Sequence, residues 1–326
     1  MHNEIIRRLL ISIPQLLLMS LITYLFIDLA PGNVLDKYRF DPRISPQTIL
    51  RLEQRYHFDK PIIVQYGYWL RDAVRGDLGY SFSREAPVTA VIMERIGNTL
   101  LLGLCSILLT WLVALPLGIY AAVRQYSWGE RILSFISYCG MSLPSFFIAL
   151  VLMYLVYLGS DLPVIDKLPI GGMVSANFQD LSWLGKLGDR IAHLILPVTI
   201  LTIGSLAGLQ RICRGNMLEE LRKHYILTAR AKGVSEHGVV YGHALRNAIN
   251  PLITLIGFEF SALLSGAALL EIIINWPGLG SLMLAAVRSQ DTYLVMGSML
   301  IGGCMLILGN LVADILLLIA DPRVRS

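Results

Sequence analysis

Charged side chains are scarce in this 326-residue chain, where Asp, Glu, Lys and Arg together make up 15% of the residues. An average soluble domain has about 25% charged residues, and just under half of its residues are apolar. Here the hydrophobic share is 55%. These proportions exclude an ordinary water-soluble protein and indicate that most of the chain lies in lipid.

Cysteine is also rare and widely spaced along the chain. The four cysteines are Cys105, Cys139, Cys213 and Cys304. Their spacing matches neither a zinc-binding pattern nor a disulfide framework. We therefore expect them to be small apolar packing residues, and we expect no metal site.

Motifs for catalysis are missing as well. A chain that hydrolyses ATP should carry the pattern G-x-x-x-x-G-K-[ST], whose backbone amides bind phosphate groups. The one Gly-Lys pair, Gly185 and Lys186, is followed by Leu187 and lacks the earlier glycine. No nucleophile triad, zinc-protease motif or pair of catalytic carboxylates stands out. We predict no catalytic residue, and any ATP hydrolysis must reside on another chain.

Six stretches are long and apolar enough to cross a bilayer as helices, which requires roughly 20 residues. They are Leu9–Ile27, Leu100–Val123, Ile132–Leu158, Ile191–Gln210, Pro251–Ile274 and Leu294–Ala320. The first is longer than a signal-peptide core and no A-x-A cleavage pattern follows it, so we expect it to be retained. The sequence thus predicts an all-α integral membrane protein with six transmembrane helices.

Basic residues gather on one side of this predicted arrangement. Seven of them lie between Arg211 and Arg246, and the loop at Arg124 falls on the same side. Cytoplasmic loops carry an excess of Lys and Arg, so we assign this side and both termini to the cytoplasm. The segment 31–95 then lies outside. It holds ten basic residues, but segments of this length cross the membrane regardless of charge.

The outer segment is rich in proline and aromatic residues, which favours a folded insertion over a linker. Ser45 followed by Pro46 is a helix-start signature, and Tyr66, Trp69 and Leu78 can pack a small core. We divide the chain into residues 1–95, with the extracytoplasmic insertion at 31–95, and residues 96–326. The second part is a transmembrane domain of five helices with a cytoplasmic loop at 211–250.

This cytoplasmic loop is the most informative part of the sequence. Its pattern predicts an amphipathic helix from about Asn216 to Lys232, ended by Gly233, and a second helix capped by Ser235 that runs toward Ala248. Helices outside the bilayer either dock into a groove of a partner protein or lie on the membrane surface. An ordinary helix end is the alternative explanation for the glycine alone.

The runs TARAKG (Thr228–Gly233) and HALRNA (His243–Ala248) resemble the signature loop of binding-protein-dependent ABC permeases of the dipeptide, oligopeptide and nickel group. That wider family has Glu-Ala-Ala, three residues and Gly, whereas Leu227 and Thr228 replace the Glu and the first Ala here. Further matching runs are APG at 30–32, GDLGYS at 76–81, SLPS at 142–145, WPGLG at 276–280 and DPR at 321–323.

The resemblance implies the type I ABC importer permease fold and a coupling helix that docks on a separate ATPase. The implied coupling residues are Tyr225, Thr228, Ala229, Ala231, Gly233, His243 and Arg246. The implied partners are a sister permease, two nucleotide-binding ATPase subunits that hold ATP and Mg, an extracytoplasmic solute-binding protein and membrane lipid, with no nucleic acid. This chain itself would bind no cofactor. Peptides are the first expectation for the substrate, and nickel complexes and glutathione-like compounds remain open.

A few polar side chains fall inside the predicted spans. Glu259, Asn310 and Asp314 are candidates for the translocation path, because an acid at a helix centre costs about 2.5–3.5 kcal/mol and should face the bundle interior or water. For Asp314 we favour interhelical hydrogen bonding, while both explanations stay open for Glu259. We expect water to reach Glu271, near the outer surface. An ion-coupled carrier would need more such groups, and a polytopic membrane enzyme would need a catalytic cluster; these two are the alternatives.

Overall fold

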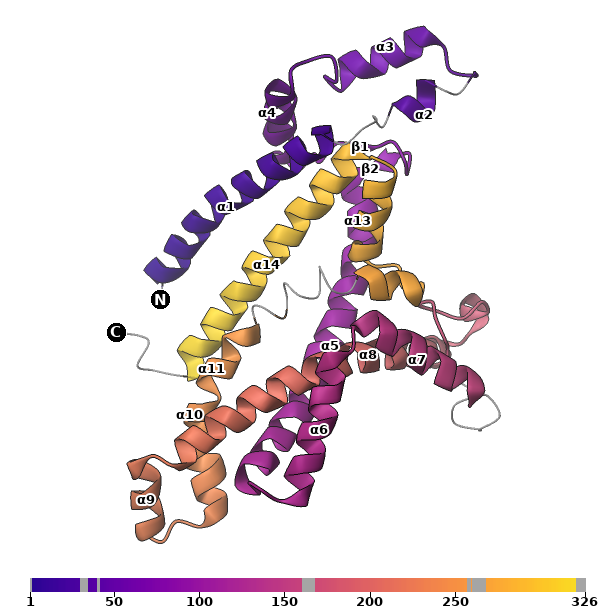
Figure 1. Ribbon diagram of the computed structural model, residues 1–326. Coiled ribbons are helices and arrows are strands. Elements are labelled where there is room, and N and C mark those ends of the chain that lie inside the picture. The colour runs from indigo at the N-terminus through magenta and orange to yellow at the C-terminus, as the bar shows by residue number, and fades with distance from the viewer. Residues whose placement is uncertain are drawn as a thin grey trace. The chain divides into compact units, whose positions relative to one another are not determined.

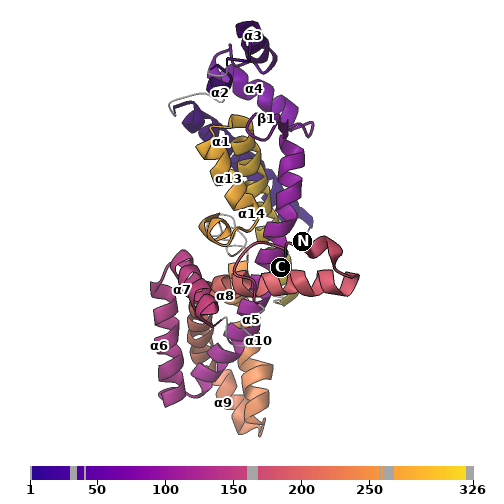
Figure 2. The same ribbon diagram turned by 90° about the vertical axis from the view of Figure 1, so that its right-hand side faces the viewer.

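The computed structural model in Figures 1 and 2 describes residues 2–29, 35–39, 42–159, 168–256, 259 and 268–320. The helices are α1 (His2–Leu29), α2 (Asp36–Arg39), α3 (Pro46–Arg55), α4 (Ile62–Ala73), α5 (Val88–Val123), α6 (Trp128–Ser142), α7 (Ser145–Leu158), α8 (Trp183–Leu221), α9 (His224–Ala231), α10 (Leu245–Ala248), α11 (Asn250–Ile253), α13 (Leu279–Arg288) and α14 (Thr292–Ala320). A 3-10 turn, η1 (Phe178–Asp180), and a π-helical segment, η2 (Gly238–Ala244), join them. Strands β1 (Tyr80–Ser81) and β2 (Ala86–Pro87) pair antiparallel.

Within the described residues, four helices are long and apolar enough to cross a membrane. They are α1, α5, α8 and α14, and the pair α6 and α7 makes a fifth if it counts as one bent span. The predicted all-α membrane protein is therefore confirmed. The predicted span Pro251–Ile274 lies partly outside the described residues, so the number six stays a prediction.

The predicted span Ile132–Leu158 is not one straight helix. It is divided into α6 and α7, whose axes differ by 107° (Figure 1). The break lies at Leu143, which has extended backbone angles (φ −103°, ψ 130°), and at Pro144. Proline has no amide hydrogen and disfavours the helical conformation of the residue before it, which accounts for the break at Pro144.

The first of two compact units comprises Met1–Thr99 and Pro277–Ile307. Its α3 begins as predicted, because the Ser45 side chain accepts a hydrogen bond from the Thr48 amide at 3.2 Å. Trp69 is buried and donates from Nε1 to the Leu78 carbonyl at 3.3 Å. Trp69 and Leu78 therefore pack together as predicted, while the folded extracytoplasmic insertion at 31–95 stays a prediction.

Asp291 holds distant parts of this unit together. It is fully buried, and its Oδ2 accepts hydrogen bonds from Ser81 Oγ at 2.7 Å and from the Ser83 amide and Oγ at 2.8 and 2.7 Å. Its Oδ1 accepts from the Leu294 amide at 3.3 Å, as an N-cap of α14 does. The carboxylate thus joins the β1–β2 hairpin to the start of α14, which explains the serine that ends the GDLGYS run.

The second unit comprises Leu100–Trp276 and Leu308–Ser326. Its helix α8 packs against both α6 and α7. Polar contacts accompany the pairing with α6: Arg214 lies 3.0 Å from the Glu130 carboxylate, and Ser137 donates to Gln210 at 3.1 Å. One apolar core surrounds Cys213 and Met217 near the end of α8, and a second surrounds Ile200 nearer its middle.

The loop at 211–250 differs from the prediction in its first helix. Helix α8 continues past the predicted membrane boundary to Leu221, and α9 begins only at His224 after a break at Arg222 and Lys223. Tertiary packing accounts for the break, since α9 turns back to bury Ile226 in the core around Met217. The second helix begins as predicted, with Ser235 Oγ accepting from the Gly238 amide at 3.3 Å, and continues through η2 into α10.

Glu271 is another correction, because it is fully buried rather than reached by water. The chain turns sharply after it: Asn275 has a positive φ of 52°, and the Trp276 amide donates to the Glu271 carbonyl at 2.7 Å. Trp276 is itself 2% exposed. This turn keeps Glu271 in the protein interior, which a charge count along the sequence does not reveal.

We expect Asp291→Ala to lower the free energy of unfolding by about 3 kcal/mol, because hydrogen bonds to a charged group contribute about 1.5–3 kcal/mol each and the donors on Ser81 and Ser83 would lose their acceptor. Thermal unfolding of the purified protein in detergent measures the effect. The control is Asp77→Ala, which removes an exposed carboxylate that accepts from the Gly79 amide at 2.9 Å. Equal melting temperatures for the two variants would contradict the anchoring role of Asp291.

Candidate functional site

Helix α9 is fixed to the rest of the loop by its apolar face. Ile226 is fully buried and Ala229 is 8% exposed, and both belong to the core that contains Met217, Val239 and Ala244. The methyl group of Ala229 is small enough to let α9 lie close to this core. Ala229 therefore faces the interior of the chain and holds the loop together.

The opposite face of α9 is open. Leu227, Thr228 and Ala231 are exposed there, as are His243 and Arg246 farther along the loop, whereas the hydroxyl of Tyr225 is directed toward Glu220. Leu227 is 53% exposed although it is apolar. Figures 1 and 2 show α9 beside the helix that leads into α10, at the end of α8. The loop thus presents an exposed helical surface on a well-packed base.

Gly233 ends α9 as the sequence analysis predicted, and it does so in the left-handed conformation with φ +76°. The Val234 amide donates to the Ala229 carbonyl at 3.2 Å and the Gly233 amide donates to the Arg230 carbonyl at 2.9 Å, which is the pattern of a glycine helix end. No atom lies within 4 Å of the position that a Cβ at Gly233 would take. Glycine is required here by backbone conformation and not by packing within this chain.

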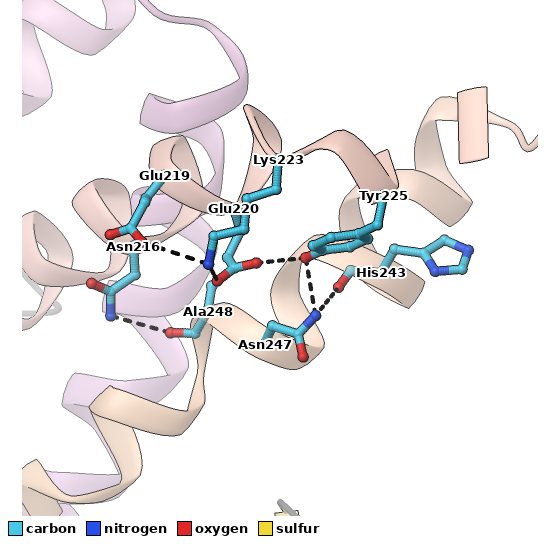
Figure 3. Close-up of polar contacts among 8 residues, drawn as sticks. All are labelled: Asn216, Glu219, Glu220, Lys223, Tyr225, His243, Asn247 and Ala248. Atoms are coloured by element: carbon cyan, nitrogen blue, oxygen red, sulfur yellow. Dashed lines mark hydrogen bonds and ion pairs between the residues drawn. The ribbon is translucent and has the colours of Figure 1, made fainter. Parts of the chain in front are cut away.

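A polar network joins three helices of the loop (Figure 3). At the end of α8, the Glu220 carboxylate accepts hydrogen bonds from Lys223 Nζ and from the Tyr225 hydroxyl, each at 2.5 Å. Asn247 of α10 donates from Nδ2 to the same Tyr225 hydroxyl at 2.9 Å. Asn216 of α8 donates to the Ala248 carbonyl at 3.2 Å. These contacts connect α8, α9 and α10.

The two side chains that donate to Glu220 keep their protons near neutral pH. Burial, and then the hydrogen bond to Glu220, raise the pKa of Tyr225 above its ordinary value of 10.0. The hydrogen bond to Glu220 also raises the pKa of Lys223 above 10.5. Both donors therefore keep their protons well above physiological pH, so the network persists there.

The loop carries more positive charge than its acids balance. Three of its seven basic residues lie in ion pairs: Arg214 with Glu130 at 3.0 Å, Lys223 with Glu220 at 2.5 Å and Arg230 with Glu236 at 2.8 Å. In the part of the chain that the structure describes, the other four lack such a pair and are exposed. They are Arg211, Arg222, Lys232 and Arg246. The exposed surface is therefore basic.

A cavity of about 270 Å³ lies in the second unit, and Glu259 lines it. The Trp111 indole Nε1 donates to Glu259 Oε2 at 3.1 Å, which holds this carboxylate inside the bundle. Small polar and apolar side chains form the remaining wall: Ser106, Ile107, Thr110, Gly140, Met141, Leu143, Ser145, Leu201, Gly204 and Ser205. A carboxylate and several hydroxyl groups give the cavity a polar lining.

The other two path candidates lie elsewhere. Asn310 and Asp314 are four residues apart in α14, where Asn310 is exposed and Asp314 is half-buried. Neither is among the described residues that line the cavity. Of the three path candidates, Glu259 is therefore the one that lines the cavity described above.

Several residues of the site escaped the sequence analysis. Glu220 and Asn247 were missed because their partners are set by the break at residues 222–223, for which the sequence has no proline or glycine signal. Trp111 was missed because an aromatic residue in an apolar span is normally read as a packing residue. The available signal for the cavity wall was the pair Ser106 and Thr110, whose hydroxyl groups share one helix face because the residues are four apart.

Residues 114–326 match the family described as binding-protein-dependent transport system inner membrane component, and residues 1–103 match the corresponding N-terminal family. The oligopeptide transport system permease protein AppB of Bacillus subtilis is 37% identical over 326 residues, which is all of both chains. The dipeptide transport system permease protein DppB of Escherichia coli K12 is 34% identical over 336 residues, covering 100% of this chain and 99% of the relative. A putative peptide permease protein of Brucella ovis is 35% identical over 323 residues, covering 98% of each.

The two alanines of α9 give a matched pair for testing its packing. We expect Ala229→Leu to destabilise the loop by about 1–3 kcal/mol, because extra methyl groups must enter a filled core. Ala231→Leu adds the same groups at an exposed position and should change the stability little. Hydrogen exchange of the α9 amides measures both. If the two variants exchange at the same rate, Ala229 does not secure the helix.

Proposed function

The chain belongs to the inner membrane components of binding-protein-dependent transport systems and is a transport permease, not an enzyme, and we propose that it forms half of a peptide import path driven by separate ATPases. Membership in this family excludes the two alternative functions, an ion-coupled carrier and a polytopic membrane enzyme. The peptide substrate is proposed because relatives that match the full length of the chain are named oligopeptide and dipeptide permeases.

The observation that carries the ATPase coupling is the exposed face of α9 on its packed base. An exposed helix that carries an apolar side chain such as Leu227 among basic residues is more favourably placed in a groove of a partner protein than in water. Thr228, Ala231 and Gly233 would lie at this contact, and Tyr225 would hold α9 in position through its bonds to Glu220 and Asn247. His243 and Arg246 would lie at its edge, and Ala229 would support it from below.

The mechanism couples ATP to access by moving this loop. ATP and Mg would bind to the partner subunits, and closure of the ATPase dimer would draw the docked loops together. Because α8 runs without interruption from its membrane portion to Leu221, displacement of the loop would tilt that helix. The permease would then open outward to accept substrate, and hydrolysis would return it. Such a cycle requires the ATPases to bind ATP more tightly in one of the two states.

The translocation path would be shared with a sister permease, and Glu259 is our first candidate for its lining. The cavity beside Glu259, with its hydroxyl groups, supports this role, since peptides need polar partners inside a membrane. Asn310 and Asp314 remain second candidates. A solute-binding protein would deliver peptide at the outer face, which the region 31–95 would cover. The protein would lie in the bacterial inner membrane with both termini in the cytoplasm.

Cysteine labelling of intact cells tests the sidedness. We expect single cysteines at Arg75 and Gln179 to react with an impermeant reagent from outside, and cysteines at Arg124 and Lys232 to react only after cell lysis. All four positions are exposed. The background must lack the native cysteines because Cys139 is exposed. Labelling of position 232 from outside, with protection at 75, would overturn the orientation.

Gly233→Asp tests the docking role. We expect it to reduce transport and ATPase co-purification together by at least about tenfold, because a docking loss of 1.4 kcal/mol has that effect. The left-handed backbone costs a residue with a Cβ about 1–2 kcal/mol, and the new carboxylate would be buried at the contact. The position is open in the chain itself, so membrane insertion should persist.

Gly242→Asp is the matched control for this substitution. Gly242 lies on the same loop, also has no atom within 4 Å of a Cβ, and shows no positive φ. Its variant should retain most of the transport. Gly233→Ala separates strain from charge, since it adds only the Cβ. If Gly233→Asp co-purifies with the ATPase at the wild-type yield and transports normally, this loop is not the docking element.

A further inference from the structure

The junction between α8 and α9 is the place where movement of the loop could be lost. Helix α8 ends at Leu221, and two residues separate it from α9. Lys223 has extended backbone angles (φ −73°, ψ 150°), so the helical hydrogen-bond ladder is interrupted there. A few such residues at the end of an element can act as a hinge. A push on α9 would bend this hinge and leave α8 in place unless other contacts bridge it.

Apolar packing bridges the junction without fixing its angle. Ile226 and Ala229 of α9 share a core with Met217 of α8 and with Val239 of η2. Hydrophobic contact is favourable but not directional, so it holds the helices together and resists their rotation weakly. The direction of α9 relative to α8 must be set by contacts with defined geometry.

Glu220 supplies those contacts (Figure 3). Its side chain is only 13% exposed, and it accepts from Lys223 within the junction and from Tyr225 beyond it, both at 2.5 Å. Hydrogen bonds to an ionised acceptor are shorter and stronger than those between neutral groups. The carboxylate therefore spans the break from the last turn of α8 to the first turn of α9.

Tyr225 extends this connection to the second helix of the loop. Its hydroxyl donates to Glu220 and accepts from Asn247 Nδ2 at 2.9 Å, and Asn247 also donates to the His243 carbonyl at 3.3 Å. Asn216 joins α8 to the end of α10 through the Ala248 carbonyl. The three helices are thus connected at two points that lie on either side of the junction.

We propose that Glu220 is a positioning residue for energy coupling: its carboxylate, through Tyr225 and Asn247, makes α8, α9 and α10 one rigid body across the junction at residues 222–223. Force applied to α9 then tilts α8 and is not absorbed at the hinge. The inference rests on the proposed function, because the force comes from the ATPase partner. Glu220 itself touches neither nucleotide nor substrate.

The test uses the full transporter, with its ATPases and solute-binding protein, purified through a tag on the permease and reconstituted in proteoliposomes. Three quantities are measured on each variant: the yield of co-purified ATPase, the rate of ATP hydrolysis, and dipeptide uptake per ATP hydrolysed. The variants are Glu220→Ala, Tyr225→Phe and Glu220→Gln. Glu219→Ala is the control, since it removes an adjacent carboxylate that is 74% exposed and lies 3.5 Å from Lys223.

We expect Glu220→Ala and Tyr225→Phe to keep the ATPase bound and hydrolysing ATP, while uptake per ATP falls roughly twofold to thirtyfold, the range that coupling mutations span. Glu220→Gln should restore much of the coupling, because an amide oxygen still accepts from the Tyr225 hydroxyl. Glu219→Ala should behave as the wild type. The double variant Glu220→Ala with Tyr225→Phe should be no worse than the more severe single variant, because both remove the same connection.

Three outcomes would overturn the proposal, and they differ in what else they contradict. If uptake per ATP stays at the wild-type value in both Glu220→Ala and Tyr225→Phe, the network does not transmit force. If ATPase yield falls in step with uptake, these residues serve the docking surface and not the junction. If the wild-type permease itself retains no ATPase, the proposed function fails, and the role of Glu220 fails with it.

Discussion

Lipid hydrocarbon offers no hydrogen-bond partner to a peptide group, and the described architecture depends on this constraint. Helices α1, α5, α8 and α14 satisfy their backbone groups internally over lengths that can cross a bilayer. Departures from helical structure need protein around them. At the bend between α6 and α7, Met141 and Leu143 line the cavity beside Glu259, and irregular backbone is tolerated where it lines a cavity. The other large break, at residues 222–223, lies beyond the predicted membrane boundary, where water can satisfy the exposed backbone.

Features set by local chemistry could be predicted from the sequence. The apolar runs of α1, α5, α8 and α14, the Ser45 cap and the positive φ of Gly233 each depend on a few neighbouring residues. Features set by tertiary packing could not. The 107° angle at Pro144 and the start of α9 at His224 depend on what the helices bury, and the burial of Glu271 depends on a turn.

The candidate site also combines features that local chemistry predicts with features that only tertiary packing sets. The exposed face of α9 follows from its amphipathic pattern, and the family resemblance pointed to this loop before its geometry was known. Glu220 and Asn247 belong to different helices from Tyr225, and only the fold brings the three together. Glu259 illustrates the intermediate case. Its polarity within an apolar span marked it as unusual, but the cavity and the bond to Trp111 come from other helices.

The buried Asp291 has a consequence for how the protein is made. Its serine partners in the β1–β2 hairpin precede it by up to 210 residues. At a synthesis rate of 5–20 residues per second, about 10–40 s pass between the emergence of the hairpin and that of the carboxylate. Throughout this interval Ser81 and Ser83 must stay hydrated or bind another acceptor. Biogenesis of the first unit therefore cannot be completed during translation of its N-terminal half, and a ribosome that stalls before α14 leaves an unfinished hairpin for quality-control proteases.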